Sequence, residues 1–162
     1  MLEIRRIHPH EVTTTRRLIY LIAHEVFNDT RSLEESIAFY DSKGVLDDMD
    51  DIQKTYFENN GTFLVMDNDG QIVGTGAIRR MDEEICELKR LWFLKEFRGK
   101  GLGYKMTQEL LSFARSKGYQ RVRLETDPVY QKPALAFYKR MGFYEIPKYS
   151  QHNDEVALEL LL

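Results

Sequence analysis

The stretch "LWFLKEFRGKGLGYKM", residues 91 to 106, carries the most specific signal in the chain. Three bulky apolar residues suit a central strand, glycines follow at positions 99, 101 and 103 with Arg98 and Lys100 among them, and a helix-forming sequence comes next. The first N–H groups of a helix have no carbonyl partner, and the helix dipole favours negative charge there. Glycines let such amides converge and let an anion approach without meeting a Cβ atom. The stretch therefore predicts a strand, a turn and a helix, with room for a diphosphate at the turn.

Two widespread phosphate-binding motifs do not fit this loop. The G-x-x-x-x-G-K-[ST] spacing of a P-loop is absent, and the dinucleotide motif G-x-G-x-x-G needs a different glycine spacing. That motif also opens a βαβ unit, whereas this strand follows a predicted hairpin. Taken alone, the G-x-G-x-G pattern fits either an anion site or a permissive strand-to-helix turn.

The hydrophobic patterns on both sides of the loop predict further helices and strands. Helical spacing of apolar residues predicts helices over residues 10–27, 33–44, 104–117 and 133–142. Period-two runs predict strands over residues 2–7, 61–80, 84–94, 121–127 and 155–162, and the 61–80 run turns at Asn68-Asp69-Gly70, a hairpin signal. This order predicts an α+β domain around one mixed sheet.

The composition limits the class of protein. A chain of 162 residues with 43% hydrophobic and 30% charged residues is expected to fold as a single domain over residues 1–162. Its net charge of −3 gives no general argument for a nucleic-acid partner. Cys86, the single cysteine, rules out an internal disulfide, and its apolar neighbours predict a buried thiol. Because no run has the length of a signal-peptide core or a membrane span, we expect a cytoplasmic protein without a membrane partner.

Two segments around the loop resemble the motifs of one family. "RGKGLG", residues 98–103, matches the [RQ]-x-x-G-x-[GA] acyl-CoA loop of the GNAT superfamily of N-acetyltransferases. "QKPALAFYKRMGF", residues 131–143, is similar to the family's N-x-x-A-x-x-[LF]-Y-x-x-x-G-F segment, except that Gln131 stands where the family usually has Asn. The order of predicted elements also fits, so the likeness covers nearly the whole chain.

The resemblance implies a fold, a co-substrate and a reaction. The fold is that of the acyl-CoA N-acyltransferases (GNAT): α+β, with a single mixed, mostly antiparallel sheet flanked by helices on both faces. The protein is then an enzyme, an acetyl-CoA-dependent N-acetyltransferase that uses acetyl-CoA as co-substrate and no metal. The acetyl group is expected to move directly to a primary amine in a ternary complex.

The resemblance also assigns the residues that bind acetyl-CoA. The pyrophosphate is expected on the backbone amides of residues 99–104. The pantetheine arm is expected to lie like an extra strand beside residues 91–93, where a backbone N–H near Phe93 polarises the thioester carbonyl. The residues so implied are Leu91, Trp92, Phe93, Arg98, Gly99, Lys100, Gly101, Leu102, Gly103, Tyr104, Gln131, Ala134 and Tyr138.

Two residues are the catalytic candidates. Glu87 matches the position of a family glutamate that removes the proton of the amine, and an unbulged strand would place it on the same face as Leu91 and Phe93. A salt-bridged strand glutamate is the alternative, and a strand bulge would redirect its side chain. Glu83 and Glu84 are weaker substitutes. Tyr138 matches the family tyrosine beside the CoA sulfur and is the candidate acid; an aromatic residue that packs on the sheet is its alternative.

The acceptor is less defined than the co-substrate. A small amine or amino-acid-like molecule is expected, with a protein N-terminus or lysine as an alternative. A non-catalytic acyl-CoA-binding module and a nucleotide phosphate binder are further alternatives. The run "LDDMDDI", residues 46–52, fits a solvated acidic turn or helix start, or an acidic flank that attracts a cationic acceptor. The protein is expected to act as a monomer or homodimer.

Overall fold

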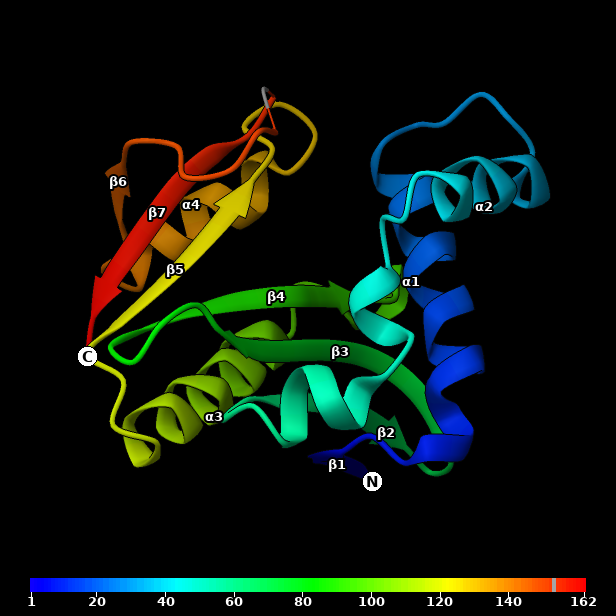
Figure 1. Cartoon of the computed structure of the whole chain (residues 1–162). Coiled ribbons are helices and arrows are strands. Elements are labelled where there is room, and N and C mark those ends of the chain that lie inside the picture. The colour runs from blue at the N-terminus through cyan, green and yellow to red at the C-terminus, as the bar shows by residue number, and fades with distance from the viewer. Residues whose placement is uncertain (153) are drawn as a thin grey trace.

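The structure, a computed structural model, describes residues 1–152 and 154–162. These residues form a seven-stranded sheet in the order β1-β2-β3-β4-β5-β7-β6 (Figure 1). All neighbouring strands are antiparallel except β4 and β5, which run parallel, so the expected mixed, mostly antiparallel sheet is confirmed. The strands are β1 (Leu2–Arg6), β2 (Thr62–Asn68), β3 (Gln71–Arg80), β4 (Ile85–Phe93), β5 (Arg121–Thr126), β6 (Tyr144–Ile146) and β7 (Val156–Leu161).

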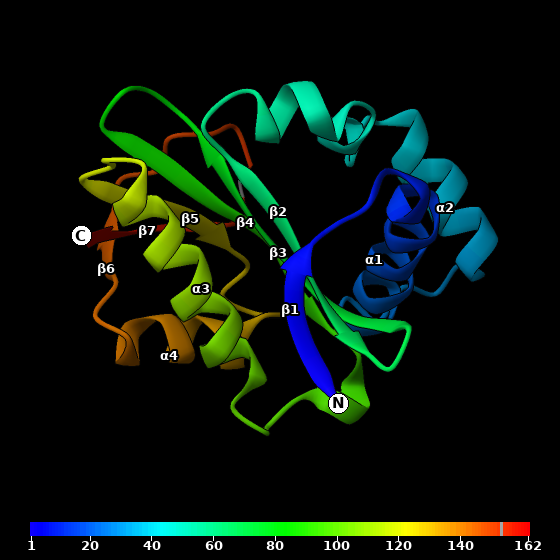
Figure 2. The same cartoon turned by 90° about the horizontal axis from the view of Figure 1, so that it is seen from below.

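Helices cover both faces of the sheet. Figure 2 shows α1 and α2 on one side of the strands and α3 and α4 on the other, as the resemblance implied. The helices are α1 (Val12–Val26), α2 (Leu33–Ser42), α3 (Leu102–Ser116) and α4 (Lys132–Arg140), each within a few residues of its predicted range. Short helical turns are η1 (Pro9–Glu11), η2 (Asp47–Met49), η3 (Gln53–Phe57, a π-helix) and η4 (Lys95–Phe97).

The two helical layers bury separate hydrophobic cores. Under α3 and α4, Met106 and Leu110 pack with sheet residues such as Val122. On the opposite face, Ile19 of α1 packs with Met49 and with other residues that precede β2. The amphipathic helices are therefore stabilised mainly by the apolar surface that they bury against the sheet, rather than by helix propensity alone.

The hairpin between β2 and β3 forms where the sequence predicts it. Asn68 pairs with Gln71, and the two residues between them, Asp69 and Gly70, have φ angles of 52° and 95°. These positive values are the ones that a two-residue hairpin turn requires, and Asp and Gly tolerate them. The turn thus fixes the register of β3, which in turn positions β4.

The strands β4 and β5 separate after three residue pairs. Ile85, Cys86 and Glu87 pair with Arg121, Val122 and Arg123, and the pairing then stops. Figure 1 shows the two strands meeting at one end and spreading apart at the other. No strand within the described residues pairs with this edge of β4 beyond Glu87. The backbone of the second half of β4 is therefore open to a ligand.

Two other expectations concern the surface and the core. The Cys86 side chain is fully buried, which confirms the expected buried thiol, and burial raises the pKa of the thiol to about 12. Across residues 1–152 and 154–162, no helix combines the length and the apolar character that a membrane crossing requires. The assignment to one domain over residues 1–162 stays a prediction.

Candidate active site

A cavity of about 750 Å³ lies where β4 and β5 separate. Its walls come from both faces of the sheet, since α1 contributes Ala23 and His24 on one face and α4 contributes Tyr138 on the other. Of the residues predicted from the sequence, the cavity brings together Glu87, Leu91, Trp92, Gln131 and Tyr138. The cavity thus crosses the sheet, so that two ligands entering from opposite faces would meet in it.

A bulge in β4 changes which face its side chains occupy. Lys89 pairs with Ala77 and Trp92 pairs with Thr75, so two residues of β4 lie opposite the single Gly76. Arg90, one of the two, has a φ of 58°, and its carbonyl accepts a hydrogen bond from the Thr75 hydroxyl at 2.6 Å. An extra residue in one strand shifts the alternation of side chains by one position.

Because of this bulge, one expectation about Glu87 is wrong. Leu91 and Phe93 belong to the core under α3, as does Leu88, whereas Glu87 alternates with Leu88 and points to the opposite face. Glu87 therefore does not share a face with Leu91 and Phe93. It lies on the α1 side of the sheet, where Trp92 packs with the second core.

The backbone of Phe93 lies at the open edge of β4. The Leu94 amide donates to Val73 of β3 at 3.0 Å, and neighbouring residues of a strand direct their backbone groups to opposite sides. The Phe93 carbonyl accepts a hydrogen bond from Arg98 Nε at 2.9 Å, which agrees with this direction. The Phe93 amide is therefore placed on the side that β5 has vacated.

The glycine loop connects this edge to α3. Gly99 and Gly101 have φ angles of 73° and 77°, and a Cβ atom added to either would meet nothing within 4 Å. The backbone conformation therefore favours glycine here, whereas packing within the chain does not require it, and the space around an added Cβ atom is open. Gly101 is the N-cap residue of α3. Since glycine has no side chain to accept a hydrogen bond, it leaves the first backbone amides of the helix uncapped.

The flanking loop residues differ in how they are placed. Lys100 lies over the Phe97 ring, with Nζ 5.6 Å from the centroid. Leu102 is buried in the core, so only its backbone is available to a ligand. Gly103 follows in the first turn of α3. Ala134 of α4 packs against the core and does not line the large cavity.

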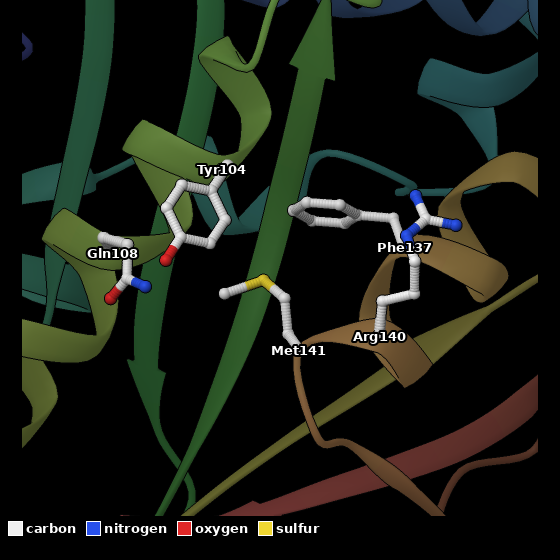
Figure 3. A pocket seen from close by; sticks show the side chains of 5 residues that line it. All are labelled: Tyr104, Gln108, Phe137, Arg140 and Met141. Atoms are coloured by element: carbon white, nitrogen blue, oxygen red, sulfur yellow. The ribbon is translucent and has the colours of Figure 1, made fainter.

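A second cavity of about 390 Å³ lies beside the first turns of α3 (Figure 3). Tyr104 and Gln108 of α3 face Phe137, Arg140 and Met141 at the end of α4. The Tyr104 side chain is 52% exposed although it is aromatic. The sequence pointed to Tyr104 but not to its neighbours in this cavity.

Both oxygens of the Glu87 carboxylate have a partner. Tyr149 donates its hydroxyl to Oε2 at 2.7 Å, and Lys89 Nζ lies 3.6 Å from Oε1. The Glu87 side chain is 16% exposed. Glu87 is therefore a salt-bridged strand glutamate and also lines the cavity. Its partner Tyr149 was not indicated by the sequence.

Tyr138 belongs to the core and lines the cavity as well. Its ring packs with Phe137 and Phe143 at centroid distances of 5.4 and 5.6 Å. Burial raises the pKa of its hydroxyl well above the usual value, so the hydroxyl stays protonated near neutral pH. In the part of the chain that the structure describes, the hydroxyl has no hydrogen-bond partner. It is thus available to a ligand in the cavity.

Gln131 uses half of its amide within the protein. Its Oε1 accepts hydrogen bonds from the Asp127 amide at 3.0 Å and from Thr126 Oγ1 at 3.3 Å. These contacts join the end of β5 to the start of α4. Gln131 also lines the large cavity, so the NH₂ group remains as a possible donor to a ligand.

The acidic run of residues 46–52 forms a short helical turn, η2, in which Asp47 is exposed, as are Asp50 and Asp51 after it, so the expected solvated acidic turn or helix start is confirmed for these three residues. The role of the run as an acidic flank for a cationic acceptor stays a prediction. Asp48 is buried and pairs with Arg90, while Asp50 pairs with Arg16 at the surface. Asp51 accepts a hydrogen bond from the Lys54 amide. These carboxylates are used to hold the segment before β2, and Leu46 is the member of the run that reaches the cavity wall.

Comparisons with known proteins show the family of this chain and its fold. Residues 22–143 match the model of the acetyltransferase (GNAT) family. "Uncharacterized N-acetyltransferase YjgM" of Escherichia coli (strain K12) is 34% identical over 101 residues, which cover 60% of this chain and 60% of that protein. The chain therefore spans less than two thirds of the length of this curated relative.

Solved structures show the same fold. A GNAT-family acetyltransferase of Staphylococcus aureus Mu50 superposes with a TM-score of 0.85 at 20% identity, covering 100% of this chain and 99% of that one. The PaiA N-acetyltransferase of Thermoplasma acidophilum, solved in complex with coenzyme A, gives a TM-score of 0.80 at 18% identity, with 100% and 99% coverage. From the match of residues 22–143 to the family model, the chain belongs to the acetyltransferase (GNAT) family.

Proposed function

We propose that the protein is an acetyl-CoA-dependent N-acetyltransferase that moves the acetyl group directly to a small primary amine in a ternary complex. The observation that carries this proposal is the open edge of β4, which runs without a strand partner from Glu87 to the glycine loop at the start of α3. An extended ligand with a diphosphate at one end fits that path. A relative solved with coenzyme A has the same fold.

The proposed binding mode relies on the backbone. The edge of β4 near Leu91 and Phe93 would pair with the amide groups of the pantetheine arm, as an added strand does. The amides of residues 99–104, with Arg98 and Lys100 nearby, would hold the diphosphate at the positive end of α3. In the second cavity, Tyr104 and Phe137 offer aromatic faces and Arg140 a cation, which suits the adenosine end of the molecule.

The proposed chemistry assigns one proton transfer to each catalytic side chain. Glu87 takes a proton from the acceptor ammonium, so that the nitrogen lone pair can attack the thioester carbonyl carbon. The Phe93 amide stabilises the oxyanion that develops on the carbonyl oxygen. When the C–S bond breaks, Tyr138 gives its hydroxyl proton to the departing sulfur. The nitrogen then releases the second proton that it carried through the attack, and this proton restores the Tyr138 hydroxyl, so the net proton stays on Glu87. No metal ion takes part in these steps as proposed.

The sides of the cavity suit this division of roles. Glu87 lies on the α1 face of the sheet. Because of the bulge at Arg90, Leu91 and Phe93 lie on the opposite face, which α3 covers. The acceptor would enter from the α1 face and acetyl-CoA from the face of Tyr138. A cavity of about 750 Å³ that holds the end of the pantetheine arm leaves room for a small molecule. We therefore favour a small amine or amino-acid-like acceptor over a protein chain.

The test is release of free thiol from acetyl-CoA in the presence of a panel of amines. The panel includes small primary amines, amino acids, and peptides with a free N-terminus or a lysine. Turnover with small amines and with none of the peptides supports the proposal. Turnover with peptides alone would make the protein a peptide acetyltransferase, and binding of acetyl-CoA without turnover across the panel would make it a binding module.

A second measurement separates acyl-CoA binding from nucleotide binding. Thermal unfolding is followed with acetyl-CoA and, separately, with ATP, because a ligand that binds the folded state raises the unfolding temperature. Stabilisation by acetyl-CoA alone is expected. Stabilisation by ATP alone would show that the glycine loop binds a nucleotide phosphate instead.

A further inference from the structure

The segment between β6 and β7, residues 147–152, holds two carboxylates of the cavity wall. Tyr149 donates to Glu87 of β4 at 2.7 Å, and Ser150 Oγ donates to Glu125 of β5 at 2.8 Å. Because β4 and β5 separate beyond Glu87, these two contacts reach both sides of the opening. The segment therefore bridges the two strands where they no longer pair with each other.

The Tyr149 ring lies beside the last pair of residues that joins β4 to β5. Glu87 and Arg123 form that pair, and the Arg123 guanidinium lies 5.9 Å from the centroid of the Tyr149 ring. Arg123 is itself fixed, since its Nε donates to Glu159 at 2.8 Å. The ring thus has a defined place, and its hydroxyl reaches Glu87 from a fixed position.

The contact suits a carboxylate that must stay charged and keep one orientation. With 16% of its side chain exposed, Glu87 receives little help from water and depends on Lys89 and Tyr149. Burial first, and then the neighbouring Glu87 charge, raise the pKa of Tyr149, so its hydroxyl remains a donor at any working pH. A hydrogen bond to an ionised acceptor is stronger than one between neutral groups, and it restricts the side-chain rotamer.

We propose that Tyr149 is a positioning residue that holds the Glu87 carboxylate in place to accept the proton of the acceptor amine. This rests on the proposed function, in which Glu87 is the base. Tyr149 itself takes no part in a proton transfer. It acts at the acceptor side of the cavity, so its loss should leave the binding of acetyl-CoA unchanged.

The chain offers a matched control for the test. Tyr144, in β6, donates its hydroxyl to Oε1 of Glu159, which lies outside the cavity wall, and Arg123 keeps its own hydrogen bond to Oε2 when the Tyr144 hydroxyl is removed. Tyr149→Phe and Tyr144→Phe therefore remove the same chemical group and the same type of hydrogen bond, from a tyrosine to a carboxylate. Thermal unfolding of both variants shows whether either loses its fold.

Initial rates are measured for these variants in the normal chain and in a Glu87→Gln background. Tyr149→Phe is expected to lower kcat about tenfold, a part of the roughly 10²–10⁴-fold that a general base contributes, with the KM for acetyl-CoA unchanged. In the Glu87→Gln background, Tyr149→Phe should cause no further loss. Tyr144→Phe should leave kcat unchanged in both backgrounds.

A second readout is how the loss of kcat in Tyr149→Phe depends on the basicity of the acceptor amine. A general loss of structure would lower kcat equally for all amines. An alkylamine is compared with its β,β,β-trifluoro analogue, which is mostly neutral at the assay pH and needs no base to free its lone pair before the attack. The deficit of Tyr149→Phe should be large for the alkylamine and small for the fluorinated amine. An equal deficit for both amines would overturn the positioning role.

The remaining outcomes separate this inference from the proposed function. If Glu87→Gln is slow while Tyr149→Phe keeps the normal kcat, the inference about Tyr149 fails and the proposed base stands. Equal losses from Tyr149→Phe in both backgrounds would also refute it. If Glu87→Gln keeps the normal rate, or the unmodified protein transfers no acetyl group, the proposed function fails and the inference fails with it.

Discussion

Arg90 and Asp48 are joined by two hydrogen bonds, Nη2 to Oδ1 at 2.6 Å and Nε to Oδ2 at 3.1 Å, and 15% and 4% of their side chains are exposed. Arg90 is the bulge residue of β4, and the pair ties it to the segment that precedes β2. Its Nη2 also donates to the Val45 carbonyl, and Tyr56 donates its hydroxyl to Asp48. The left-handed backbone of Arg90 is thus held by a buried, hydrogen-bonded ion pair.

Replacing Asp48 by Asn should destabilise the fold strongly. Burial alone would raise the pKa of Asp48, but the hydrogen bonds and charge of Arg90 outweigh it and hold the pKa below its usual value. Asp48→Asn leaves the buried guanidinium without a counter-charge, which costs about 3–5 kcal/mol when one partner of a buried pair is removed. Urea unfolding measures the change.

Asp50→Asn is the control from the same acidic run. Asp50 pairs with Arg16, and 62% of its side chain is exposed. Exposed pairs contribute about 0–1 kcal/mol, so this variant should unfold close to the normal protein. Equal losses from Asp48→Asn and Asp50→Asn would mean that burial does not set the strength of these pairs.

The glycine loop can be tested with a charge of the same sign as the diphosphate. Gly101→Glu should weaken CoA binding by a factor on the order of 100, since each lost hydrogen bond to a charged group costs about 1.5–3 kcal/mol. Gly118→Glu is the matched control, because Gly118 also has a positive φ, 84° against 77°, and open space around an added Cβ. Calorimetric titration with CoA measures both affinities.

The two glycine variants carry the same backbone strain and the same added charge. They differ in position, since Gly101 precedes α3 and Gly118 follows it. A similar loss of affinity in both would point to strain rather than to the anion site. Normal affinity in Gly101→Glu would remove the diphosphate from this loop.

Acid should weaken the fold in part through Glu11. Two hydrogen bonds from Arg5, at 3.0 and 2.7 Å, lower the pKa of Glu11 from its usual 4.5 to about 2. A carboxylate whose pKa is lower in the folded state stabilises the fold fully above pH 4.5, and this contribution is lost as the pH falls toward 2. The free energy of unfolding should therefore fall more steeply over this range in the normal protein than in Glu11→Gln.

The check on this prediction is urea unfolding at a series of pH values. Glu34→Gln serves as the control, because Glu34 is held by Arg17 in a pair whose side chains are 70% and 56% exposed. Water and salt screen such a pair, so removing it should have less effect on how steeply the free energy of unfolding falls with pH. If the free energy of unfolding falls equally steeply with pH in the normal protein and in Glu11→Gln, the lowered pKa of Glu11 does not contribute to acid sensitivity.

The parts of the fold that local sequence controls could be predicted. The turn at Asp69-Gly70, the alternation of β5 and the helix after the glycine loop each depend on residues close together in the chain. Residues Val122, Leu124 and Thr126 are buried in the order that alternation requires. The glycines at 99 and 101 indicated a turn before the helix, and both have the positive φ angles that few other residues adopt readily.

The parts that depend on distant contacts could not be predicted. Arg90 is a poor candidate for a left-handed backbone, and the residue that holds it, Asp48, lies 42 positions away. The partner of Glu87, Tyr149, lies 62 positions away in a segment without a motif. The bulge then reversed the face expected for Glu87, because one inserted residue shifts every side chain beyond it.

Tyr138 should be needed for the rate of transfer and not for the binding of acetyl-CoA. Its hydroxyl stays protonated because burial raises its pKa, and it lines the cavity without a described protein partner. Tyr138→Phe keeps the ring that packs with Phe143 and removes the proton donor. We expect kcat to fall about 10²-fold, within the range for general acid catalysis, with the KM for acetyl-CoA spared.

Tyr119→Phe is the control for loss of a buried tyrosine hydroxyl. Tyr119 is 5% exposed, and its hydroxyl donates to the Asn60 carbonyl away from the cavity. This variant should lose about 1 kcal/mol of stability and keep its kcat. If Tyr138→Phe turns over at the normal rate, the sulfur must take its proton from another source, and Tyr138 is then a core aromatic that happens to line the site. If its kcat falls while that of Tyr119→Phe does not, the loss belongs to the proton donor.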